Sequence, residues 1–326
     1  MPAPESSPSD LDALDPATAR IAVVGPGAVG TFYAAQLSVA GRNVVACGRR
    51  PFDRYIVESD AVPVDDPAVA LTDPADLGAA GFDGSVDLVI VTVKTFQTAG
   101  AASWLDALCG SDTIVAGAQN GVEEVERLTP YVNGAAVVPC VVYCGSELIA
   151  PGHIRHAQHG IMIVPDNAIT RAVAPLFDGS AARWRPDENF VAETWRKLGI
   201  NVMANGVTAL TRRTMDVLGT HPVDDVARAL LRECLTVARA DGVEVDPSEA
   251  DEYDLSVMPR YGTSMYQDVM ADRPTEYEAL HGAVLRAGER YGIDTPVTRV
   301  VYALLAGREA VTAPPSRSNA DRFGPG

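Results

Sequence analysis

Apolar positions in the first half of the chain alternate between short continuous runs and stretches of helical periodicity. Residues 21–29 form an apolar run that enters a glycine turn, and the stretch TFYAAQLSVAG that follows is typical of a helix ending at Gly41. Further apolar runs follow at NVVAC, VDLVIVTV (86–93), TIVAGA (113–118) and AAVVPCVVY (135–143). Strands buried on both faces have this pattern, and their alternation with helices predicts a parallel sheet with right-handed crossovers. The stretch PGHIRHAQHGIMIVP (151–165) is typical of an antiparallel pair, so we expect a hairpin at the edge of this sheet.

Beyond about residue 188 the pattern becomes helical, and no strand is evident. The segments NFVAETWRKLGINVMANGVTALTRR, VARALLRECLTVARADG and TEYEALHGAVLRAGERYG all carry helical periodicity. We therefore place a domain boundary near Asn189, between an α/β domain over residues 20–188 and an all-α domain over residues 189–311. The acidic segment 1–19 and the segment 312–326 are expected to be disordered tails.

Composition and charge exclude several classes of protein. The chain has 326 residues and a formal net charge of −17, and a protein this acidic repels phosphate backbones, so we expect no nucleic-acid partner. No apolar run approaches the roughly 20 residues of a membrane span. The N-terminus lacks the basic and apolar regions of a signal peptide. The five cysteines are odd in number and include no CxxC, which favours free thiols in a reducing cytoplasm.

A glycine-rich turn gives the strongest local indication of a ligand. It consists of Gly25, Pro26, Gly27, Ala28, Val29 and Gly30, a GxGxxG pattern placed directly between a strand and a helix. The first glycine permits the tight turn, the second lets the backbone approach a pyrophosphate, and the third allows close packing of helix and strand. The helix N-terminus then faces the phosphates. We expect a dinucleotide-binding Rossmann domain, and the predicted fold class is an α/β Rossmann fold, a doubly wound parallel sheet with an antiparallel edge, plus an all-α C-terminal domain.

The end of the second predicted strand distinguishes between the two nicotinamide cofactors. An NAD-binding domain usually has an Asp or Glu there for the ribose 2′-hydroxyl, whereas this chain continues with Arg49 and Arg50. Two guanidinium groups suit a 2′-phosphate, so we expect NADPH, although two solvated surface arginines would give the same pattern. Which of the two contacts the phosphate is open.

Several separated motifs extend this interpretation: GPGAVG, VTVKTFQ (91–97), QNGVEEVERL (119–128), PGHIRH (151–156), WRKLGINVMANGVTAL (195–210) and TSMYQDVMADRPTEYEALHG (263–282). In this order they resemble the ketopantoate reductase (2-dehydropantoate 2-reductase) family over about residues 20–310. The related β-hydroxyacid dehydrogenases are less similar. The resemblance implies NADPH-dependent reduction of 2-dehydropantoate to pantoate, on the route to pantothenate and coenzyme A. A small-molecule 2-keto acid is the expected partner, and a homodimer is compatible with the resemblance.

Lys197 is the candidate general acid. Only two of the 26 basic residues are lysines, and an ammonium can release a proton where a guanidinium stays charged. Asn201 and Asn205 follow Lys197 at i+4 and i+8, so the three polar side chains share one face of an otherwise apolar helix. Reduction of a 2-keto acid develops negative charge on the keto oxygen, which a nearby cationic acid stabilises and protonates. The resemblance assigns this role to the lysine and places the asparagines in the substrate pocket. A solvated helix face is the alternative.

The resemblance adds four residues to the expected site. Lys94 ends a predicted strand at the carboxyl edge of the sheet, and the resemblance places it and Asn120 near cofactor and substrate. It gives Glu276 a part in orientation or proton handling, and it has Ser264 contact the substrate carboxylate. Each also has an ordinary explanation: a strand-end cation, an Asn-Gly turn, an acid in the first turn of a helix, and a helix serine.

One departure from the family pattern bears on specificity. The family commonly has Asn-Gly where this chain has His281 and Gly282, so substrate preference differs if that Asn contacts substrate. His153, His156 and His159 do not converge in the hairpin interpretation, and we expect no metal. Three functions remain open: ketopantoate reduction, reduction of another 2-keto acid or imine, and a non-catalytic NADPH sensor. The active site is expected between the two domains.

Overall fold

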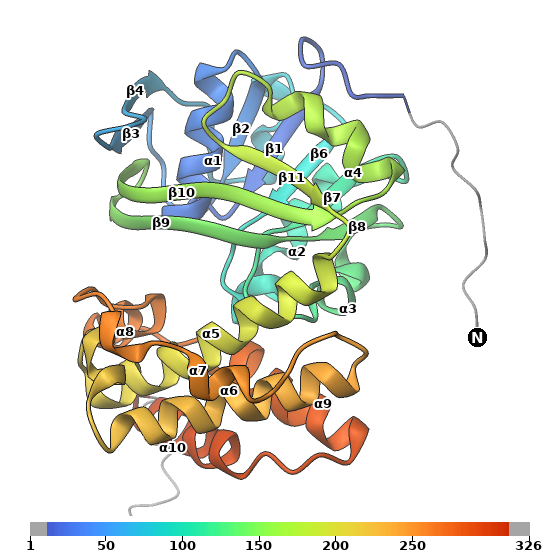
Figure 1. Cartoon of the computed structure of the whole chain (residues 1–326). Coiled ribbons are helices and arrows are strands. Elements are labelled where there is room, and N and C mark those ends of the chain that lie inside the picture. Colours follow the sequence, from blue (N-terminus) through green and yellow to red (C-terminus); the bar gives the residue numbers. More distant parts are fainter. Residues whose placement is uncertain (1–11, 313–326) are drawn as a thin grey trace, which may run out of the picture. The chain divides into compact units, whose positions relative to one another are not determined.

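The computed structural model describes residues 12–312, which form two compact units that divide between Val191 and Ala192. The first unit contains a six-stranded parallel sheet in the order β5-β2-β1-β6-β7-β8 (Figure 1). Its strands are β1 (Arg20–Val24), β2 (Asn43–Cys47), β5 (Ala70–Leu71), β6 (Leu88–Val91), β7 (Ile114–Gly117) and β8 (Ala136–Pro139). The chain order reverses between β1 and β6, so the carboxyl ends of these two strands form the switch point where such sheets bind ligands.

Both faces of this sheet are buried, as the continuous apolar runs predicted. In β1, Ile21 and Val23 join the core on one face, while Ala22 and Val24 join the core on the other. Helix α1 (Ala28–Val39) covers the first face, and its residues from Gly30 to Leu37 are all buried. Helix α2 (Ala102–Leu108) and helix α3 (Glu124–Leu128) contribute to the core on the second face.

A second, five-stranded sheet packs on the other side of α1. It contains β3 (Arg54–Glu58), β4 (Val64–Pro67), β9 (Val141–Ala150), β10 (His153–Pro165) and β11 (Arg183–Asp187). Strand β10 pairs antiparallel with β9 and parallel with both β3 and β11. Helix α4 (Ala168–Val173) follows β10 and begins with a capping box from Asn167. Short 3-10 turns complete the unit: η1 (Pro74–Asp76), η2 (Gly78–Ala80), η3 (Thr95–Ala101), η4 (Thr129–Tyr131) and η5 (Ala174–Phe177).

Two expectations about this unit were wrong in detail. Residues 151–165 do not fold as a hairpin at the edge of the parallel sheet, because Pro151 and Gly152 are themselves the turn between β9 and β10. The antiparallel pairing lies in the separate second sheet. The run 135–143 is two strands rather than one, since β8 ends at Pro139, which lacks an N–H for pairing, and β9 begins at Val141 in the other sheet.

The N-terminal segment is ordered further upstream than the expected tail over residues 1–19. The Leu14 N–H donates to the Ala172 carbonyl at 2.9 Å, and the Leu14 side chain packs against the core. Ala19 is buried as well. These contacts place residues 12–19 with the first unit, whereas residues 1–11 and the predicted tail beyond residue 312 lie outside the described residues.

The second unit is helical throughout its described part, which confirms the predicted all-α C-terminal domain. Its helices are α5 (Phe190–Thr211, which begins just before the division), α6 (Val223–Ala240), α7 (Glu249–Glu252), α8 (Ser264–Met270), α9 (Ala283–Tyr291) and α10 (Pro296–Thr312). The turns η6 (Met215–Gly219) and η7 (Leu255–Val257) connect them, and a π-helical segment, η8 (Glu278–Gly282), leads directly into α9. Helix α5 is buried on most sides and carries the predicted polar stripe.

Candidate functional site

The glycine turn lies at the switch point of the parallel sheet. Gly25 has a φ of +94°, and a Cβ built on it would lie 2.5 Å from Cγ1 of Val93, just past the end of β6. A Cβ on Gly30 would lie 2.4 Å from Oγ1 of Thr92 and 2.6 Å from the carbonyl oxygen of Gly25. The Thr92 hydroxyl also donates to the Gly25 carbonyl at 2.6 Å. Gly25 and Gly30 are therefore required by the close packing of the turn, α1 and the end of β6.

Gly27 differs, because no contact within residues 12–312 requires it to be glycine. A Cβ there would approach only the Gly25 carbonyl oxygen, at 3.9 Å, and the φ of −79° suits any residue. Gly27 is the N-cap of α1, and no side chain caps the helix there. The first N–H groups of a helix lack intrahelical partners and attract anions. Open space beside such a helix start fits a pyrophosphate group.

The end of β2 packs against the same turn. A Cβ on Gly48 would lie 2.9 Å from Cδ and Cγ of Pro26, so Gly48 holds this strand end against the glycine turn. Arg49 and Arg50 follow directly, and both are exposed. Two exposed guanidinium groups beside the turn fit a 2′-phosphate, and no carboxylate follows the strand directly to bind a 2′-hydroxyl.

Lys94 and Asn120 follow the ends of neighbouring parallel strands, β6 and β7, and both are half-buried. Gln119, which the sequence analysis did not single out, connects these two strand ends. Its side-chain amide donates to the Val93 carbonyl at 2.9 Å and to the Thr98 hydroxyl at 3.0 Å. Gln119 is only 6% exposed, so it fixes the segment that carries Lys94 relative to the one that carries Asn120. In the sequence it could not be distinguished from an ordinary turn residue.

The polar stripe on α5 is present as predicted, and its members differ in burial. Lys197 and Asn201 are half-buried, whereas Asn205 is 4% exposed. The Asn205 amide donates to Oδ1 of Asn201 at 3.2 Å, so these two side chains lie on one face. Because the remaining positions of α5 are largely apolar, the stripe is the polar edge of a buried helix.

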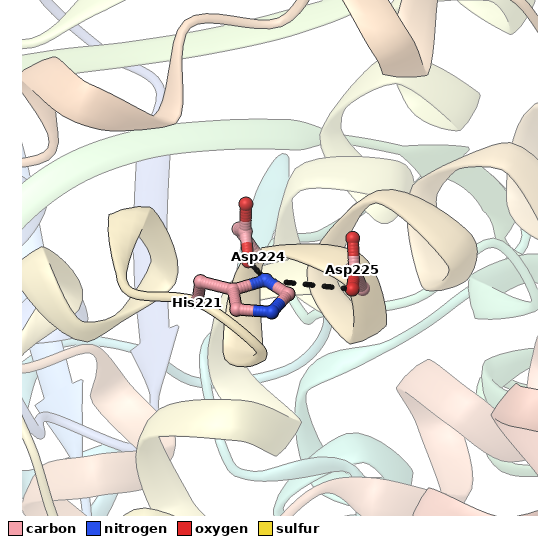
Figure 2. Close-up of side chains that lie close together, drawn as sticks. All are labelled: His221, Asp224 and Asp225. Carbon is pink, nitrogen blue, oxygen red and sulfur yellow. Dashed lines mark ion pairs between the residues drawn. The ribbon is translucent and has the colours of Figure 1, made fainter.

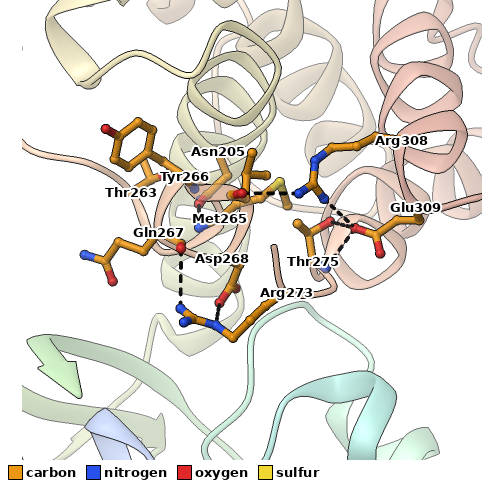
Figure 3. A network of polar contacts seen from close by, with 11 residues as sticks. Asn205, Thr263, Met265, Tyr266, Gln267, Asp268, Arg273, Thr275, Arg308 and Glu309 are labelled. Atoms are coloured by element: carbon orange, nitrogen blue, oxygen red, sulfur yellow. Dashed lines mark hydrogen bonds and ion pairs between the residues drawn. The ribbon is translucent and has the colours of Figure 1, made fainter. Parts of the chain in front are cut away.

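Asn205 also fixes the start of α8 (Figure 3). Its Oδ1 accepts from the Met265 N–H at 3.1 Å and from the Ser264 hydroxyl at 3.3 Å. One turn further along α5, the Thr208 hydroxyl hydrogen-bonds to the Thr263 hydroxyl at 2.8 Å. The structure therefore brings Asn201, Asn205 and Ser264 together, with Ser264 exposed and Asn205 supporting both neighbours.

Glu276 is 5% exposed and follows a segment held by helix α10. Oε1 of Glu309 accepts from both the N–H and the hydroxyl of Thr275 at 3.0 Å, and Arg308 contacts the same oxygen at 3.3 Å (Figure 3). This contact could not be predicted from the sequence, since Glu309 lies 34 residues from Thr275. Glu309 is thus the support that sequence reasoning missed beside Glu276.

His153, His156 and His159 form no metal-binding group with one another in the described part of the chain. His153 pairs with Glu58 at 2.7 Å, whereas His156 bonds to the Ser146 hydroxyl at 2.9 Å and stacks on Phe32. The grouping that could hold an ion among the described residues is His221 with Asp224 and Asp225 (Figure 2).

That grouping is explained by its position at the start of α6. Nδ1 of His221 lies 3.4 and 3.6 Å from the two carboxylates, and its side chain is 78% exposed. Acidic residues favour a helix N-terminus, and a solvated histidine beside them requires no metal.

Within residues 12–312 no helix is both long and apolar enough to span a membrane.

Comparison with known proteins covers both units. Residues 21–168 match the family described as Ketopantoate reductase PanE/ApbA, and residues 189–309 match Ketopantoate reductase PanE/ApbA C terminal. The chain is 36% identical over 290 residues to the 2-dehydropantoate 2-reductase of Mycobacterium tuberculosis, which covers 88% of this chain and 96% of that protein. It is 35% identical over 289 residues to the 2-dehydropantoate 2-reductase of Caulobacter vibrioides, with 87% and 97% covered. A dimeric ketopantoate reductase from Staphylococcus aureus is similar in structure, with a TM-score of 0.79 and 28% identity over 90% of this chain and 99% of that one.

Proposed function

Because the chain belongs to the ketopantoate reductase family, we propose that it reduces 2-dehydropantoate to pantoate with NADPH. The observation that carries this proposal is the stripe of Lys197, Asn201 and Asn205 along a buried, otherwise apolar helix. A reductase of a 2-keto acid needs a proton donor flanked by hydrogen-bonding groups, and this stripe combines an ammonium group with two amides on one helix face.

Residues 20–188 form the cofactor domain in this proposal, and residues 189–311 form the substrate domain. The open space at Gly27 supports a pyrophosphate at the start of α1, and the exposed Arg49 and Arg50 support a 2′-phosphate. Asn120 and Lys94, at the carboxyl ends of adjacent strands, contact cofactor or substrate from the sheet edge. When bound, NADPH supplies the hydride that reduces C2 of the keto acid.

Lys197 supplies the proton. Its Nζ donates to the keto oxygen, and its positive charge stabilises the negative charge that develops there during reduction. Arginine could not replace it, because a guanidinium does not release its proton at any usable pH. Glu276, whose segment is fixed through Thr275 and Glu309, orients the reacting groups.

The substrate is held by neutral hydrogen-bonding groups. Ser264 is exposed at the start of α8 and binds the substrate carboxylate, while Asn201 is half-buried beside Lys197. Asn205 already holds both of these neighbours through its own amide. The overall charge of −17 repels an anionic keto acid, so the site also needs the local positive charge of Lys197 beside these neutral groups.

A spectrophotometric assay of NADPH oxidation tests the function. Ketopantoate should support turnover, with one pantoate formed per NADPH oxidised, and 2-ketoisovalerate, which lacks the hydroxymethyl group, is the matched control. Faster turnover with another keto acid would assign the chain to a related reductase with the same machinery. Tight NADPH binding without turnover of any keto acid would favour the sensor and contradict the proposal.

Light scattering in the same buffer tests a homodimer, which the dimeric relative supports.

A further inference from the structure

His281 stands in a π-helical segment directly downstream of Glu276. In this segment, Glu278–Gly282, the backbone is wider than an α-helix, and the Glu276 carbonyl accepts from the N–H groups of both Ala279 and Leu280 at 3.1 Å. Single π turns inside helices frequently occur at functional sites, because they turn a side chain toward a position that a regular helix would not give it.

The His281 ring points into the protein and contacts helix α5. It is fully buried, and its Nε2 lies 3.1 Å from the carbonyl oxygen of Val202, the residue after Asn201. Because a carbonyl only accepts, Nε2 must carry the proton and donate. Nδ1 has no hydrogen-bond partner among the described residues, and burial lowers the pKa of His281 to about 4, so the ring is neutral. A fully buried ring cannot contact substrate directly. The difference from the Asn that the family commonly has at this position therefore does not act through a direct contact with substrate.

A glycine in α5 makes room for this ring. A Cβ on Gly206 would lie 2.4 Å from Nε2 of His281 and 2.8 Å from Cγ1 of Val301 in α10. Val202 and Gly206 are four residues apart, so they form a second stripe on α5, next to the stripe of Lys197, Asn201 and Asn205. The ring therefore packs at one defined position along the axis of α5, beside Val202 and Gly206.

We propose that His281 is a positioning residue, which fixes the segment carrying Glu276 at one position along the axis of the helix that carries Lys197. The hydrogen bond from Nε2–H to the Val202 carbonyl sets this position, and Gly206 lets the ring come close to α5. The inference rests on the proposed function, in which Lys197 and Glu276 act in the same reduction. It adds a residue that contacts neither substrate nor cofactor.

Three substitutions at one position separate the donor from the packing. In His281→Gln, the amide nitrogen is as many bonds from Cα as Nε2, so the donor is kept. In His281→Asn the donor is one bond short, and in His281→Leu it is absent. Leu218→Ala is the matched control, since Leu218 is fully buried in the same unit on η6, which carries no site residue. Each variant is compared with the wild type in kcat, in KM for the keto acid and NADPH, and in melting temperature.

We expect H281L and H281N to lower kcat by about 10- to 100-fold with little change in KM for NADPH, because small misplacements of reacting groups have effects of this size. H281Q should stay within about 3-fold of wild type, and L218A should lower the melting temperature but not kcat. Wild-type kcat in H281L, or equal loss in H281Q and H281L, would overturn the inference. If H281L does not fold, the comparison of H281N with H281Q gives the answer.

A second measurement does not depend on catalysis. Amide hydrogen exchange in residues 197–206 should be faster in H281L and H281N than in wild type, and unchanged in H281Q and L218A. Unchanged exchange in H281L and H281N would overturn the inference even in an active enzyme. A wild-type protein that turns over no keto acid would instead contradict the proposed function. The exchange experiment would still test whether the contact with His281 stabilises α5.

Discussion

Alanine substitutions at Gly27 and Gly30 are expected to have opposite consequences, although both lie in the same glycine turn. In Gly30→Ala the new Cβ would lie 2.4 Å from Oγ1 of Thr92 and 2.6 Å from the Gly25 carbonyl oxygen. The second contact is with backbone, which cannot rotate away. Overpacking of this kind costs about 1–3 kcal/mol, so the melting temperature of the protein without cofactor should fall by at least about 2 °C.

In Gly27→Ala the nearest atom is 3.9 Å away and the φ of −79° suits alanine. Fewer unfolded conformations should leave stability unchanged or raise it by about 0.4–1 kcal/mol. The added methyl group would, however, occupy the space assigned to the pyrophosphate. Loss of one charge-assisted hydrogen bond, worth about 1.5–3 kcal/mol, should lower the affinity for NADPH by about 10- to 100-fold.

Fluorescence titration with NADPH and thermal unfolding without cofactor measure the two effects separately. Gly307→Ala is the matched control, because a Cβ there meets nothing within 4 Å and would likewise cause no clash. Gly307 lies in α10, away from the glycine turn in sequence and in a different unit. It should bind NADPH like the wild type. Unchanged NADPH affinity in Gly27→Ala would refute the assignment of this open space to the cofactor.

Three further variants test the roles of the two arginines, Lys197 and Asn205. Replacing Arg49 and Arg50 together by Ala should weaken NADPH by at least about 10-fold and leave NADH nearly unchanged, measured by titration with both; equal weakening would make them ordinary surface charges. Lys197→Ala should lower the rate by about 10²–10⁴ with little loss of NADPH binding in stopped-flow experiments, and a near-normal rate would remove Lys197 as the acid. Asn205→Ala should destabilise the protein by about 1–3 kcal/mol in denaturant unfolding, because the buried Met265 N–H loses its acceptor; wild-type stability would contradict that support role.

The parallel sheet was predictable because its strands are buried on both faces. In β6, Leu88, Val89, Ile90 and Val91 form one apolar run, and all four side chains are fully buried. The second sheet was not predictable in the same way. Its longest strand, β10, contains three register shifts within residues 153–161 and mixes histidines with apolar residues, so no period of two survives in the sequence.

Within the candidate site, periodicity revealed what lies on one element and missed what joins two. Lys197 and Asn201 were found because both lie on α5 at helical spacing. Gln119, Glu309 and the contact between His281 and Val202 were missed, since the residues of these contacts are 21 to 79 apart along the chain. Only the tertiary fold brings such partners together, and no spacing in the sequence encodes that.

In the proposed reaction the Lys197 ammonium protonates the keto oxygen. A crystal structure of the protein with NADP⁺ and pantoate would measure the distance from Nζ of Lys197 to the C2 hydroxyl oxygen of pantoate. We expect a hydrogen bond of about 3 Å, with the same hydroxyl-bearing carbon facing the nicotinamide ring. A Lys197 side chain directed into solvent, away from the bound pantoate and dinucleotide, would contradict it.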